Sequence, residues 1–313
     1  MTTRNETRGL GGSVRAGFTL VELLVAMSII AVLVSLGTAA YIRALWRAQE
    51  VEVTTKLSQL DAAIEAFKSK YGFYPPDFTR INNVNEFVPY LNRIAPNHAY
   101  NMAQLNVWWN QVGQEIQTRG PLVSYVFWLS GLSKNKQFPL SNPYTGHPLV
   151  AYNAALHADG SPTVDASNNP IVIEREVFFD FEHPRLIFAG PQNQVAGYSQ
   201  FSGTPDPMVY FEIGSIPISN NAAAIPAVNV ITSKGNYVVR PYFDPAKIPA
   251  VALTEQLQRR ESFQLIAAGM DGHFSIVGQP TTQDPRDANK FERDNLVNFV
   301  DGAKLEILIF AQP

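Results

Sequence analysis

Residues 17–42 of this chain read GFTLVELLVAMSIIAVLVSLGTAAYI, and this stretch decides the fold of the N-terminal part. From Leu23 to Ile42 it contains no charged residue. A helix of about 20 residues rises about 30 Å, which matches the hydrocarbon thickness of a bilayer. The sequence therefore predicts a membrane-spanning helix over residues 18–42.

A buried core helix and a secretory signal peptide are the two alternative interpretations of this run. Apolar stretches that form buried core helices are usually shorter. The apolar region of a signal peptide covers only about 7 to 15 residues and ends at a cleavage site of small residues. Here the run is longer and continues directly into an amphipathic pattern, which favours the membrane helix.

Basic residues lie on the N-terminal side of the apolar run. Arg4, Arg8 and Arg15 precede it, against a single acidic residue, Glu6. Because positively charged flanks of a membrane helix stay in the cytoplasm, we expect a cytoplasmic N-terminus and the larger part of the chain on the opposite side.

A carboxylate at the head of an apolar span is energetically costly, and such residues usually have a functional reason. In this chain the carboxylate ends the hexapeptide Gly17-Phe18-Thr19-Leu20-Val21-Glu22. Behind a basic leader, this hexapeptide resembles the processing site of type IV pilins and type II secretion pseudopilins. The resemblance implies that a prepilin peptidase removes residues 1–17 by cutting between Gly17 and Phe18. It also implies N-methylation of Phe18 and a role for Glu22 in filament assembly.

The chemistry of the new N-terminus explains why a carboxylate is retained there. Cleavage frees an amine at Phe18, which is cationic near neutral pH. In a filament, Glu22 of one subunit would meet the Phe18 amine of its neighbour, and pairing relieves the cost of both charges in an apolar environment. In the unassembled membrane form, the alternative is that Glu22 reaches out to the lipid headgroups.

The helical pattern continues beyond the membrane segment. Apolar residues at intervals of three and four mark one helix face, namely Leu57, Leu60, Ile64, Phe67 and Tyr71. Gly72 and the pair Pro75-Pro76 end the pattern. We therefore expect one helix from Thr19 to Tyr71. The predicted division of the chain is a removed leader (1–17), a membrane or filament-core helix (18–42), an amphipathic helix (43–76) and a globular head (77–313).

The head is predicted to be α+β with an antiparallel sheet, in a pilin-like fold. Short helices are expected over 87–94, 105–117 and 121–132, and residues 220–228 are expected to form a surface loop. Trp108 and Trp109 are expected to pack partly in the core, and the alternative is that they line a binding surface. Lys234-Gly235-Asn236 suits a hairpin turn. The expected strands are 149–153, 171–174, 177–181, 186–189, 208–212, 237–242, 263–267 and 305–310.

Two segments of the head resemble the major, G-type pseudopilin of type II secretion. Gly269-Met270-Asp271-Gly272-His273-Phe274 is similar to its Gly-x-Asp-Gly loop, and Asp294-Asn295-Leu296-Val297-Asn298-Phe299 is similar to its closing segment. The resemblance implies a calcium ion bound by Asp271 and Asp294, since Ca²⁺ prefers oxygen ligands. The alternative is a plain β-turn, because Asp-Gly is a common turn signal. The head is longer than is typical of the G type, mainly between Tyr74 and the Gly269 loop.

Composition and motifs exclude several classes of function. The net charge of −3 argues against a nucleic-acid partner. The absence of cysteine excludes disulfides and thiolate metal sites. The sequence has no zinc-protease motif, nucleophile elbow or phosphate-binding loop, so we predict that the chain is not an enzyme.

The sequence is therefore interpreted as a structural subunit of a type II secretion pseudopilus, in the inner membrane with a periplasmic head. The resemblance implies prepilin peptidase, other pseudopilins or pilins, an assembly ATPase and a platform protein as partners. The alternatives are a minor pilin of a type IV pilus, a tip adhesin or other binding subunit, and a membrane-tethered enzyme.

Overall fold

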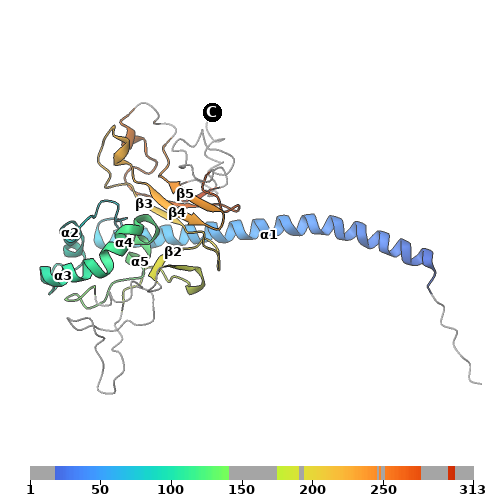
Figure 1. The fold of residues 1–313 in the computed structure, drawn as a ribbon, viewed down its shortest axis with the longest axis horizontal. Coiled ribbons are helices and arrows are strands. Elements are labelled where there is room, and N and C mark those ends of the chain that lie inside the picture. The colour runs from blue at the N-terminus through green and yellow to red at the C-terminus, as the bar shows by residue number, and fades with distance from the viewer. Residues whose placement is uncertain are drawn as a thin grey trace, which may run out of the picture. The chain divides into compact units, whose positions relative to one another are not determined.

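A computed structural model of the chain describes residues 18–140, 175–189, 194–244, 247, 251–275 and 295–299. The chain divides into two compact units, Met1–Ala48 and Gln49–Pro313. Helix α1 spans Leu20–Tyr71, 52 residues, and no proline interrupts it (Figure 1). This confirms the predicted single long helix, whose first residue is one position later than expected.

The head half of α1 is amphipathic as predicted. Five residues of its apolar face, Val53, Leu57, Leu60, Ile64 and Phe67, are at most 1% exposed. The helix ends at Gly72, where φ is 81° and the amide donates to Lys68 O at 2.7 Å. A positive φ is easily adopted only by glycine, so the sequence stops the helix at the point where the chain turns.

Four short helices follow α1 in the chain. They are α2 (Val84–Ile94), α3 (Met102–Trp108), α4 (Gln114–Arg119) and α5 (Ser124–Leu129). Their shared core is aromatic and contains Phe78, Phe87, Trp108, Trp109, Phe127 and Trp128, all at most 6% exposed. The prediction that Trp108 and Trp109 belong to the core is therefore confirmed.

The predicted helix 105–117 is correct in place but is divided into α3, a π-helical turn over Trp109–Gly113, and α4. The Trp109 ring lies across Gly113, where a Cβ atom would be 2.4 Å from the ring. The local widening of the helix thus accommodates a large ring beside a residue that has no side chain.

The strands form three small antiparallel sheets in the described part of the head. One is the hairpin β1 (Leu186–Ala189) and β2 (Gln194–Tyr198), and another is the hairpin β4 (Val228–Thr232) and β5 (Gly235–Val239). The third has the order β3-β6-β7, and its strands are Val209–Glu212, Phe263–Ala267 and Leu296–Val297. The predicted α+β class with antiparallel pairing is confirmed.

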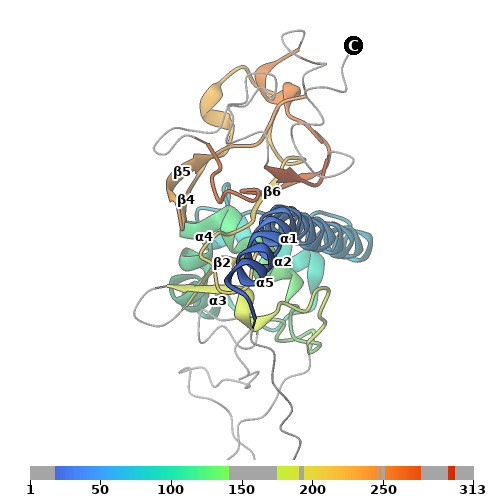
Figure 2. The same cartoon turned by 90° about the vertical axis from the view of Figure 1, so that its right-hand side faces the viewer.

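The β3-β6-β7 sheet is buried on both faces. Tyr210 and Leu265 belong to the core that α1 shares with helices α2 to α5, whereas Phe211 and Ile266 pack in a second core with the β4-β5 hairpin. Figure 1 shows strands β3 to β5 above the head half of α1, with α3 and α5 below it, and Figure 2 gives the view turned by 90°. Because the sheet is covered on both faces, β3 and β6 lack polar alternation.

Some strand predictions were wrong. Residues 177–181 form no strand, because the amides of Phe178 and Phe179 donate to Leu129 O, at the C-terminal end of α5. Strand β2 was missed, and β4 begins at Val228, where a surface loop was expected. The predicted strands 149–153, 171–174 and 305–310 lie outside the described residues.

Candidate functional site

The start of α1 is held by a reciprocal pair of contacts between Thr19 and Glu22. The Thr19 amide and hydroxyl each donate to Glu22 Oε2 at 2.9 Å, and the Glu22 amide donates to Thr19 Oγ1 at 3.2 Å. This is a capping box, in which a threonine and a glutamate three residues later satisfy amides that have no partner within the helix. The predicted assembly carboxylate is therefore also one half of the capping box, in which Thr19 is the cap residue.

The Glu22 carboxylate can bind a cation in addition to its two hydrogen bonds from Thr19. A carboxylate offers about four lone-pair positions. The two bonds from Thr19 both go to Oε2. Phe18, the other predicted site residue described here, is 85% exposed, and Gly17 lies outside the described residues. Thr19 was not singled out from the sequence, although Thr-x-x-Glu before an apolar run is a known signature of a helix start.

In the first half of α1, every described side chain is exposed and most are apolar. This half belongs to the one helix in the described ranges that is long and apolar enough to cross a membrane, by length and composition. Its three hydroxyl side chains donate to carbonyl groups of the preceding turn: Ser28 to Leu24 O, Ser35 to Val32 O and Thr38 to Val34 O, at 2.7–2.8 Å. These polar groups are thus satisfied within the helix, as an apolar environment requires.

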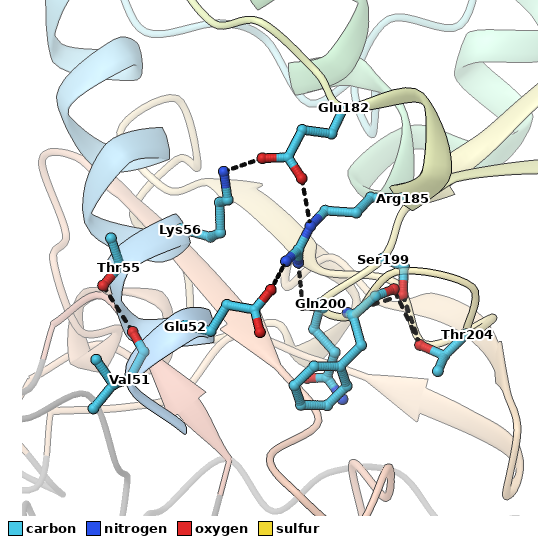
Figure 3. A network of polar contacts seen from close by, with 10 residues as sticks. Val51, Glu52, Thr55, Lys56, Glu182, Arg185, Ser199, Gln200 and Thr204 are labelled. Atoms are coloured by element: carbon cyan, nitrogen blue, oxygen red, sulfur yellow. Dashed lines mark hydrogen bonds and ion pairs between the residues drawn. The ribbon is translucent and has the colours of Figure 1, made fainter. Parts of the chain in front are cut away.

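A buried arginine ties the head half of α1 to the globular part (Figure 3). Arg185, 3% exposed, contacts Glu52 of α1 through Nη2 and Glu182 Oε2 through Nε at 3.0 Å. Its Nη1 donates to Gln200 O, and Lys56 of α1 contacts the other oxygen of Glu182. The hydrogen bond from Lys56 is the main cause that lowers the pKa of Glu182. Helix and head are therefore joined by charge-assisted bonds as well as by the apolar face.

A second polar junction lies further along α1, at Asp61. Its Oδ1 accepts from Arg259 Nη1 at 2.9 Å and from Asn298 Nδ2 at 2.6 Å. The side-chain oxygen of Asn298 accepts from the Leu265 amide at 2.8 Å. One residue of the predicted closing segment thus connects strand β6 with α1.

Two carboxylates are buried where the chain leaves α1 and meets β3. Asp77 Oδ1 accepts from the Thr79 amide and hydroxyl, and Oδ2 accepts from the Glu212 amide at 3.1 Å. Glu212 Oε1 accepts from the Ser215 amide at 2.9 Å. Burial raises the pKa of Glu212 to about 7 and also raises the pKa of Asp77.

The two segments that resemble a calcium site meet in the structure. Asp271 Oδ1 accepts from the His273 amide at 2.8 Å, and burial raises the pKa of Asp271. Asn295 Nδ2 donates to Phe274 O at 3.0 Å, which joins the loop to the closing segment. Asp294 lies outside the described residues. Within the described ranges, no three Asp, Glu or His side chains come together as metal ligands.

The loop of Asp271 is also fastened on its other sides. Thr232 Oγ1 donates to Gly272 O at 3.0 Å, and Gln200 Nε2 donates to Gly269 O at 2.9 Å. Gly272 has a φ of 73°, which is typical of a glycine in a tight turn. The alternative interpretation, a plain turn, therefore accounts for the described geometry of this loop.

The prokaryotic N-terminal methylation motif matches residues 12–38 of the chain. This segment includes Gly17, Phe18 and Glu22 and ends within α1, so the match does not extend to the head. A search of curated proteins and a search of solved structures found no match. The motif indicates a type IV pilin-like protein that is processed by prepilin peptidase and assembles with other pilins.

Proposed function

We propose that this pilin-like chain is a structural subunit of a type II secretion pseudopilus and catalyses no reaction itself. The observation that carries the proposal is the methylation motif over residues 12–38, which runs into an unbroken helix of 52 residues that begins at Leu20. In this proposal prepilin peptidase cleaves between Gly17 and Phe18 and methylates Phe18. The mature chain then lies in the inner membrane with its N-terminus in the cytoplasm and its head in the periplasm.

Assembly is proposed to add a contact between subunits at the Glu22 carboxylate, beside its contacts within the chain. In the single chain, Thr19 donates two hydrogen bonds to Glu22. When an assembly ATPase and a platform protein add the subunit to a filament, the Phe18 amine of a neighbour would bind the same carboxylate. The ion pair then fixes the register, and the exposed apolar half of α1 supplies packing without a fixed direction.

The test is processing and assembly in cells that contain prepilin peptidase and the secretion components. Mass spectrometry of the mature protein should find a chain that begins at N-methylated Phe18. Glu22→Ala should be cleaved normally but should be lost from sheared filaments, whereas a Glu115→Ala control on the head should assemble. A different N-terminus would contradict the processing step, and normal filaments of Glu22→Ala would contradict the assembly step.

We also propose that Asp271 and Asp294 hold a calcium ion at the junction between the Gly269 loop and the closing segment. The donor set fits in part, because Asn295, the residue after Asp294, binds the carbonyl of Phe274 and its own Oδ1 is buried without a hydrogen-bond partner. The ion would neutralise the two carboxylates and fasten the segments together.

Thermal unfolding of the whole mature chain in detergent tests the calcium site. Chelation of calcium should lower the melting temperature of the wild type. The Asp271→Asn variant should have the melting temperature of the chelated wild type, both with and without calcium. If chelation leaves the wild-type melting temperature unchanged, the ion is not bound, and the turn interpretation stands without affecting the filament proposal.

A second candidate is a minor pilin of a type IV pilus or a tip subunit that binds a surface. The observation that favours it is the layer of helices α2 to α5, which enlarges the head between α1 and the first strand. Co-expression with the assembly components of type II secretion, or with those of a type IV pilus, distinguishes the two candidate functions. The subunit should enter filaments only with the platform protein of its own system.

A further inference from the structure

The apolar half of α1 ends in a group of aromatic and basic residues. Tyr41 is 64% exposed and Trp46 is 63% exposed. Arg43 and Arg47 are exposed as well, and no acidic residue lies between Glu22 and Glu50. A group of exposed aromatic rings is typical of an interaction surface. The partner at this end of the helix must accommodate both aromatic rings and cations.

These residues surround the helix. Arg43, Trp46 and Arg47 follow one another at intervals of three and one, which places them on one face. Tyr41 lies on the opposite face, where Leu45 is its neighbour one turn later. Leu45 is 44% exposed and Ile42 is 45% exposed, so the whole circumference is accessible at this level.

Their depth is fixed by the length of the uncharged run. Residues 23–42 rise about 30 Å along the helix axis, the thickness of the hydrocarbon layer. Tyr41 then lies at the edge of that layer, and Arg43 to Arg47 lie in the next turn, at the level of the headgroups. Tryptophan and tyrosine are enriched at this level because their rings are apolar on one side and hydrogen-bonding on the other.

We propose that Tyr41, Arg43, Trp46 and Arg47 form a collar that binds the phosphate groups of anionic phospholipids in the periplasmic leaflet. The proposal rests on the membrane insertion proposed above. Each guanidinium can bind phosphate oxygens with two parallel hydrogen bonds, while its alkyl part covers the acyl chains. Because the collar contains two cationic and no acidic side chains, it favours phosphatidylglycerol over a zwitterionic lipid.

The collar acts on the unassembled subunit. It fixes how far the helix projects from the bilayer before the subunit is incorporated into a filament. A subunit that enters a filament must leave these lipid contacts, so the collar also adds to the work of extraction. Variants without it should be held less firmly in the membrane.

The first test measures depth in phosphatidylglycerol-containing vesicles with the full mature chain. The chain contains no cysteine, so a single nitroxide label can be placed at Ile30→Cys or Ala44→Cys. The label at 44 should lie at the phosphate level, and the label at 30 should lie deep in the acyl chains. A deep label at 30 with a label at 44 in bulk water or in the acyl region overturns the collar alone. A label at 30 that is not in lipid overturns the membrane insertion itself.

The second test measures lipid preference. Energy transfer from a fluorophore at Ala44→Cys to labelled phosphatidylglycerol should exceed that to labelled phosphatidylcholine. The local preference should fall by about fivefold per arginine removed, as expected for basic residues near an anionic surface. Arg43→Gln/Arg47→Gln should therefore abolish the preference, whereas Arg93→Gln/Lys136→Gln, which removes two charges from the head, should keep it. An unchanged preference in the collar variant overturns the proposal.

Discussion

Replacing Glu212 by glutamine should remove a large part of the pH dependence of the stability of the head. Glu212 is 9% exposed, and burial raises the pKa of its carboxyl group from 4.5 to about 7. Asp77, whose carboxylate accepts from the Glu212 amide, has its pKa raised in the same direction. The two groups lie in one buried site and titrate as a coupled pair.

The sign follows from the direction of the shift. A folded state with a raised carboxyl pKa binds the proton more tightly than the unfolded chain does. The stabilisation by this group is therefore complete below about pH 4.5 and is lost as the pH rises through about 7. The shift of 7 − 4.5 = 2.5 units corresponds to about 3.4 kcal/mol, of which about 2.5 kcal/mol falls between pH 5 and pH 8.

The assay is urea unfolding of the mature chain in detergent at pH 5 and pH 8. The free energy of unfolding of the wild type should fall between these values by about 2.5 kcal/mol more than that of Glu212→Gln. Glutamine keeps the acceptor for the Ser215 amide, so the hydrogen bond at 2.9 Å can remain. Glu261→Gln, which neutralises an exposed carboxylate, should retain the wild-type pH dependence.

Equal pH dependence of the wild type and Glu212→Gln would refute this reasoning, because the carboxyl group would then titrate alike in the folded and unfolded chains. A smaller difference with the same sign would mean that water reaches the pair and reduces the cost of ionisation. A difference of opposite sign would mean that Arg80, which attracts both carboxylates, outweighs their burial.

Three further predictions concern the packing of the head and are tested by urea unfolding of the same preparation. Arg185→Met should lower the free energy of unfolding by about 1–3 kcal/mol, because the carbonyl of Gln200 loses its buried donor and Glu182 loses a charged partner; Arg93→Met, on the surface, should change it little. Gly113→Ala should lower the free energy of unfolding by about 1–3 kcal/mol, since the new Cβ would be 2.4 Å from the Trp109 ring. The control Gly37→Ala meets nothing within 4 Å and should not lower it, because alanine favours a helix more than glycine does. Asn298→Ala should cost about 1–2 kcal/mol through its bonds to Asp61 and Leu265, and Asp61→Ala in the same chain should add less than it does alone.

The sequence predicted the parts of the fold that depend on local pattern. The apolar intervals from Leu57 to Tyr71 and the stop at Gly72 determine the head half of α1, because these residues form one continuous helix face. Strand β4 also had a local signal, the alternation of Val228 and Val230 before a two-residue turn. Its first residue was assigned to the preceding polar loop. Strand β2, with Gln194, Ala196 and Gly197, has little intrinsic preference for a strand and is formed through its pairing with β1.

Sequence separation explains which parts of the candidate sites were predictable. Glu22 and its partner Thr19 are three residues apart, so their contact is contained in one helical turn and can be found by inspection. Arg185 and Glu52 are separated by 133 positions, and Asp61 and Asn298 by 237, so only the completed fold brings them together. Long-range pairs of this kind cost the entropy of closing a long loop, which the apolar core of α1 and the sheet must first offset. The polar junctions therefore depend on the core that precedes them, whereas the start of α1 needs no other part of the chain.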